Sequence, residues 1–123
     1  MATLQNDSKG THCLAVWDQD ATLKKHEIGR PAPGPKDVSI EIKYCGMCHS
    51  DLHATNGDWS MPWSPLTPGH EISGVVLGLG SDVTKYKVGD RVGVGCFVDS
   101  CMSCDMCKSG DHNYCDSVLQ TYG

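Results

Sequence analysis

The sequence has 123 residues, a net charge of −5 and eight cysteines. This length fits one domain that can bury a core without cross-links. Its lysines and arginines form no basic stripe, and it contains no apolar run of about 18 residues, so neither a nucleic-acid partner nor a membrane span is expected. The first residues are polar and lack an apolar signal region, so we expect a cytoplasmic protein whose cysteines stay reduced.

The N-terminal third is predicted to hold two short strands. After a polar tail over residues 1–10, Thr11–Asp18 favours a strand, and Leu23–Ile28 favours a weaker one. Three prolines within Arg30–Lys36 remove backbone donors and fix φ, which predicts a connecting loop.

A half-buried strand is predicted next, over Asp37–Tyr44, because apolar side chains alternate there with polar ones. His49–Thr55 favours a short helix that Asn56-Gly57 ends. The irregular segment from Asp58 to Pro68 holds tryptophans and prolines, which is typical of a pocket-lining loop.

Glu71–Leu79 and Arg91–Val94 complete the predicted strands, with a turn at Gly89-Asp90 between them. Short strands separated by glycine turns predict a mainly β fold that forms a closed or partly open barrel. Two glycine pairs, Gly78/Gly80 and Gly93/Gly95, start like a dinucleotide fingerprint. Neither has a glycine at the sixth position or a helix after it, so no nucleotide-binding domain is expected in this chain.

The stretch from Tyr44 to Glu71 concentrates thiol, imidazole, hydroxyl and carboxylate groups. Thiolate and imidazole together suit zinc, so this stretch predicts a catalytic metal site. Cys45 and Cys48 form a Cys-x-x-Cys pair, and spacing alone leaves open whether they are a redox pair or ligands of one metal.

A second metal site is predicted in a lobe over residues 96–116. Its four thiols can close around one tetrahedral zinc ion and leave no open position, which indicates a structural role; they are Cys101, Cys104, Cys107 and Cys115. Disulfides and an iron–sulfur cluster are the alternatives, although the fourth cysteine follows after seven residues instead of the three typical of bacterial ferredoxins.

These blocks together resemble the zinc-dependent alcohol dehydrogenases of the medium-chain dehydrogenase/reductase superfamily. The residues that carry the resemblance are Gly46–His53, Pro68–Glu71, Gly89–Val92 and Cys101–Cys115. Tyr44–His53 and Val98–Cys101 are most similar to the cinnamyl-alcohol-dehydrogenase-like branch, whose members usually use NADP. The resemblance implies that residues 11–123 form an incomplete GroES-like catalytic domain, a partly open β-barrel with short helices and a zinc-binding lobe.

The resemblance also implies roles for individual residues. Cys48 and His70 would bind the catalytic zinc, and Glu71 would lie behind the metal or replace a ligand. Ser50 and His53 would carry the proton from the alcohol to solvent. The remaining implied roles are the orientation of His70 by Asp51, a cofactor contact by His49, and substrate-pocket walls at Trp59 and Phe97.

Plain structural alternatives exist for these residues. His53 and His49 fit a helix surface, Ser50 fits a helix N-cap, Asp51 and Glu71 fit ordinary carboxylates, and Trp59 and Phe97 fit a core. Three further cysteines are expected to be small buried hydrophobes, namely Cys13, Cys45 and Cys96.

The implied reaction is reversible hydride transfer between a small alcohol or aldehyde and NADP or NAD, with one catalytic and one structural zinc. In the family a third zinc ligand and the nicotinamide domain lie beyond Gly123, so this chain alone is expected to be inactive. Relatives form dimers or tetramers, so a homo-oligomer is expected. A non-enzymatic zinc-binding module that acts through protein contacts is the alternative function.

Overall fold

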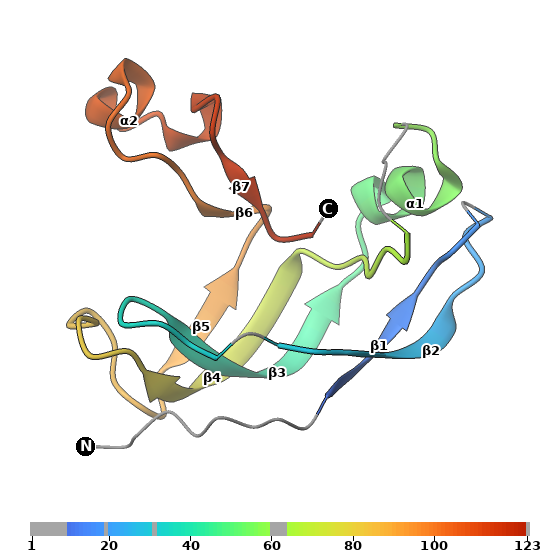
Figure 1. Ribbon diagram of the computed structural model, residues 1–123, viewed down its shortest axis with the longest axis horizontal. Helices are drawn as coiled ribbons and strands as arrows, with labels where there is room; N and C mark the ends of the chain where they lie inside the picture. The colour runs from blue at the N-terminus through green and yellow to red at the C-terminus, as the bar shows by residue number, and fades with distance from the viewer. Residues whose placement is uncertain (1–9, 19, 31, 60–63, 123) are drawn as a thin grey trace.

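The described part of the protein, a computed structural model, comprises residues 10–18, 20–30, 32–59 and 64–122. Of the predicted polar tail over residues 1–10, only Gly10 falls inside these ranges, and Pro31 of the predicted proline loop falls outside them. The chain is mainly β, with open antiparallel sheets and short helices (Figure 1). Within these ranges no helix is long and apolar enough to cross a bilayer.

Within the described ranges, the strands form three antiparallel sheets. The first pairs β1 (Thr11–Ala15) with β2 (Lys24–Ile28), the second holds β3 (Val38–Gly46), β4 (Glu71–Leu79) and β5 (Arg91–Val94), and the third pairs β6 (Phe97–Asp99) with β7 (Leu119–Gln120). The helices are α1 (His49–Asn56), α2 (Asp105–Ser109) and the 3₁₀ helix η1 (His112–Tyr114).

The register of the central sheet brings two distant segments together. β4 lies between β3 and β5, and Val76 near its middle is fully buried. Because β3 and β4 run antiparallel, Gly46 at the end of β3 pairs with Glu71 at the start of β4. The segment after β3 and the segment before β4 therefore meet at one edge of the sheet, as Figure 1 shows for α1.

The first sheet is tied to the rest through β1. Val16 and Leu66 exchange two backbone hydrogen bonds of 2.9 and 2.8 Å, and both side chains are buried. The Ser64 hydroxyl donates to the carbonyl of Trp17 at 2.8 Å. These contacts attach the N-terminal hairpin to the segment that leads into β4.

The predicted strands and the predicted helix are confirmed, but the predicted half-burial of β3 is wrong beyond its first residues. Ile42 and Tyr44 are 54% and 78% exposed. Register shifts interrupt the pairing between Ser39 and Ile40 and between Ile42 and Tyr44. Every residue from Glu41 to Gly46 is exposed, so the described residues cover neither face of this half of β3. Cys45 follows the second shift and is exposed, contrary to prediction.

Two other cysteines also differ from the predicted burial. Cys96 is exposed because it lies in the turn between β5 and β6, and Cys13 is only half-buried. The Cys13 thiol lies 3.4 Å from the Thr67 hydroxyl, so it has a polar neighbour.

Gly74 in β4 provides a test of how closely β4 packs against β3. A Cβ there would lie 2.5 Å from the Glu41 carbonyl oxygen and 2.6 Å from Ile40 Cγ2. Since backbone must move to relieve the contact, we expect Gly74→Ala to lower the free energy of unfolding by about 2 kcal/mol in urea denaturation. Gly29→Ala is the control, because a Cβ at Gly29 meets nothing within 4 Å. An equal effect at both glycines would contradict the tight β3–β4 contact.

Candidate functional site

Three different donor groups lie at the edge of the central sheet where β3 ends and β4 begins. Cys48 is the N-cap of α1, His70 immediately precedes β4, and Glu71 begins it. One donor atom from each, a sulfur, a nitrogen and an oxygen, lies within 4.8 Å of the other two. His70 is only 5% exposed, whereas Glu71 is exposed and Cys48 half-buried.

Asp51 holds this arrangement together. Its Oδ2 accepts the backbone N–H of Cys48 at 2.9 Å, which caps the start of α1. Its Oδ1 accepts the backbone N–H of Gly69 at 3.0 Å and lies 3.2 Å from His70 Nδ1. Because a carboxylate only accepts, His70 donates from Nδ1, and the lone pair of Nε2 is left free.

The donor set fits a metal with an open coordination position. Sulfur, imidazole nitrogen and carboxylate oxygen are the ligand types that zinc takes, and catalytic zinc sites use three protein ligands. A histidine ligand oriented by a carboxylate is the usual arrangement around such an ion. Cys48, His70 and Glu71, with Asp51 behind His70, meet each of these requirements.

An open cavity of about 490 Å³ adjoins the three donors. A small alcohol or aldehyde fits a cavity of this size. Its lining includes the Ser50 hydroxyl and the backbone after β5, and the full set is Cys48, Ser50, His70, Glu71, Ile72, Gly93, Val94, Gly95 and Cys96.

Ser50 and His53 lie one turn apart on α1, on the same side of the helix. Ser50 Oγ is 3.6 Å from Cys48 Sγ, so the hydroxyl lies beside the donor cluster. The alternative that Ser50 is the helix N-cap is wrong, because Cys48 occupies that position. His53 Nδ1 lies 2.8 Å from Asp58 Oδ2, which leaves its Nε2 able to accept a proton.

Asp58 is a polar partner that the sequence analysis missed. Gly57 ends α1 in the left-handed conformation, with φ of 78°, and the Asp58 N–H then donates to the His53 carbonyl at 3.0 Å. This reversal brings the Asp58 carboxylate back to the His53 ring. The sequence signal that could have indicated this contact is the acidic residue directly after the glycine that ends the helix.

The remaining predicted site residues are not among the described residues that line the cavity. His49 is exposed, and its ring is 6.2 Å from that of His53. Trp59 is 53% exposed, with its ring 5.2 Å from His53. Phe97 is 46% exposed on β6 and does not line the cavity as the described residues define it.

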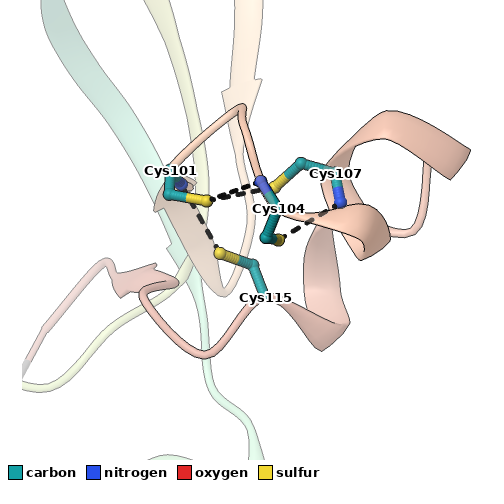
Figure 2. A group of neighbouring side chains, drawn as sticks. All are labelled: Cys101, Cys104, Cys107 and Cys115. Atoms are coloured by element: carbon teal, nitrogen blue, oxygen red, sulfur yellow. Dashed lines mark hydrogen bonds between the residues drawn. The ribbon is translucent and has the colours of Figure 1, made fainter.

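The four lobe cysteines form a second cluster, in which all sulfurs lie within 4.8 Å of one another (Figure 2). The sulfurs of Cys101 and Cys107 are 3.9 Å apart. Four sulfurs at about 2.3 Å from a tetrahedral zinc ion would be about 3.8 Å apart, so the cluster fits this ion. Cys107 and Cys115 are the two buried residues in the described lobe, and its interior is therefore sulfur, with almost no apolar core.

Hydrogen bonds to the sulfurs already favour thiolates in this lobe. The N–H and hydroxyl of Ser103, followed by the N–H of Cys104, lower the pKa of Cys101 to about 5. The Ser100 hydroxyl, 3.5 Å away, lowers the pKa of Cys107 to about 7. The Cys107 N–H also lowers the pKa of Cys104, but burial and the neighbouring thiols outweigh it and raise this pKa to about 11.

Comparison with known proteins places the chain among oxidoreductase relatives. Residues 34–123 match the family described as "Alcohol dehydrogenase GroES-like domain". The chain is 59% identical over 93 residues to NADP-dependent alcohol dehydrogenase C 1 of Mycolicibacterium smegmatis, covering 76% of this chain and 27% of that protein. It is 48% identical over 120 residues to cinnamyl alcohol dehydrogenase 8 of Arabidopsis thaliana, covering 98% of this chain and 33% of that protein.

The fold comparison agrees with the sequence comparison. A cinnamyl alcohol dehydrogenase structure from Sorghum bicolor superposes with a TM-score of 0.90 at 42% identity, over 93% of this chain and 32% of that one. The chain thus spans about a third of the length of the relatives it matches.

The three bonds to Asp51 predict a large stability effect. Asp51→Ala would leave the N–H groups of Cys48, Gly69 and His70 without their acceptor, and we expect the free energy of unfolding to fall by about 3 kcal/mol. Asp105→Ala is the control, because the Asp105 side chain is 96% exposed in the first turn of α2. Urea denaturation measures both, and a loss below about 1 kcal/mol for Asp51→Ala would contradict its bridging role.

Proposed function

Because this chain belongs to the alcohol dehydrogenase GroES-like domain family, we propose that it is the catalytic-domain portion of a zinc-dependent, NADP-linked alcohol dehydrogenase. The observation that carries the proposal is the meeting of Cys48, His70 and Glu71 within 4.8 Å, beside a cavity that Ser50 lines. The names of the relatives supply the substrate class, a small alcohol or aldehyde, and the cofactor, NADP.

Cys48, His70 and Glu71 would hold the catalytic zinc, and Asp51 would keep the Nε2 lone pair of His70 directed at it. When bound, zinc would supply Lewis-acid chemistry that lowers the pKa of an oxygen ligand, and NADP⁺ would accept the hydride, so the alcohol would lose a hydride and a proton in all.

This chain's own residues provide the route for that proton. The Ser50 hydroxyl lines the cavity and would receive the alcohol proton while it passes its own to His53. The Asp58 carboxylate fixes the His53 ring by its Nδ1 hydrogen and stabilises the positive charge that the ring gains. The His53 side chain is 42% exposed, so it can release the proton to water.

The lobe would hold the structural zinc. Four sulfurs, one of them with a pKa of about 5, favour a metal ion over four neutral thiols at neutral pH. Since the described lobe buries almost no apolar side chain, the ion would replace the missing core. A homo-oligomer in the cytoplasm completes the proposal.

Cys48→Ala tests the catalytic assignment in the active dehydrogenase. We expect kcat/KM to fall by more than about 10³-fold, because the metal ligand is lost, while His53→Ala costs only about 10²-fold, since general-base help is worth less. Cys45→Ala is the matched control, because Cys45 lies outside the donor cluster. Rates of NADP⁺ reduction measure all three, and near-normal kcat/KM for Cys48→Ala would refute the site.

Metal removal tests the structural assignment. A chelator that strips the lobe should make the backbone amides of Lys108 and Gly110 exchange with solvent quickly, while the Val76 amide in the central sheet stays protected. Hydrogen exchange with and without added zinc measures this difference. If the two lobe amides exchange equally slowly in both conditions, the lobe does not depend on a metal.

A further inference from the structure

The segment that follows the lobe returns to the candidate catalytic site. β7 pairs with β6 through Gln120 and Phe97, which reverses the direction of the chain. The Thr121 N–H then donates to the Cys96 carbonyl at 3.0 Å, and its hydroxyl donates to the Gly95 carbonyl. Gly95 and Cys96 line the cavity, so Thr121 is anchored at the cavity rim.

The two hydrogen bonds of Thr121 place the next residue, Tyr122, against the ring of His70. The two ring centroids are 5.6 Å apart and the rings are tilted by 39°. His70 is 5% exposed, and Tyr122 forms part of what covers it. Neither residue is near the other in the sequence, and the contact exists because β7 turns back from the lobe.

We propose that Tyr122 is a positioning residue that fixes the plane of the His70 ring. This inference deepens the proposed function and rests on it. The bond from Nδ1 to Asp51 holds one atom of the imidazole but permits the ring to tilt about that point. A second contact on the face of the ring removes this freedom, so Nε2 points in one direction before any metal arrives.

The lobe thereby gains a role beyond its own folding. Tyr122 is seven residues after Cys115, the last sulfur of the cluster, and β7 is the connection between them. The ordered lobe holds the end of the chain against the site. Thr121 attaches this segment to the cavity rim, because its N–H donates to the Cys96 carbonyl.

The test uses the 123-residue chain with one equivalent of Zn²⁺ in the lobe, titrated with Co²⁺. Thiolate-to-cobalt absorption gives the dissociation constant, and the d–d bands report the ligand geometry. We expect Tyr122→Leu to weaken Co²⁺ binding by about tenfold and to change the d–d bands. Tyr122→Phe keeps the ring that contacts His70, so its dissociation constant should match that of the wild type.

Tyr114→Leu is the matched control, since Tyr114 lies in the same lobe and is 69% exposed. It should leave both the dissociation constant and the bands unchanged. If Tyr122→Leu behaves like this control, the positioning role is wrong.

A separate readout distinguishes failure of the metal site from failure of this inference. If the wild-type chain takes up no Co²⁺ beyond the lobe, the proposed metal site is wrong, and solvent exchange of the His70 Nδ1 hydrogen, followed by NMR, decides the role of Tyr122. Faster exchange in Tyr122→Leu than in the wild type supports positioning, and equal exchange overturns it.

Discussion

The carboxylate of Asp51 joins two segments that the sheet register only brings near each other. Pairing of Gly46 with Glu71 places the end of β3 beside the start of β4, but it does not set the position of any donor atom. Asp51 does so, because its two oxygens accept hydrogens from Cys48, Gly69 and His70. One half-buried carboxylate thus fixes the helix start, the turn before β4 and the tautomer of the imidazole.

The two sulfur-containing clusters differ in how they relate to solvent, and this difference separates their chemistry. In the lobe, like donors surround a closed interior formed by Cys107 and Cys115. At the sheet edge, three unlike donors border an open cavity, and only His70 among them is buried. A closed shell of four ligands stabilises a fold, whereas an open shell of three leaves a position for a substrate oxygen.

Sequence patterns predicted the structural features that depend on neighbouring residues in the chain. The strand periodicity of β4, the helix stop at Gly57 and the donor types near Cys48 could all be read from neighbouring residues. The exposure of Tyr44 could not, because alternation predicts which side chains share a face of a strand but not whether another element covers that face. The short elements of the lobe escaped prediction as well, since two- to five-residue segments around buried sulfur carry no apolar period.

The contacts of Tyr122 show why such a site cannot be derived from motifs alone. The motif residues of the donor cluster come from the segments on either side of the loop between β3 and β4. The resemblance of these motifs to a known family implied each of them, whereas spacing alone left Cys45 and Cys48 undecided. Tyr122 reaches the same place only because the chain leaves the sheet after β5, encloses the sulfur cluster and returns through β7. A ligand ring that is held by one hydrogen bond retains rotational freedom, and the free energy needed to order it on binding lowers the affinity for the metal. Packing from a distant, separately stabilised lobe removes that cost beforehand, so the rigidity of the site depends on a cluster that never touches the substrate.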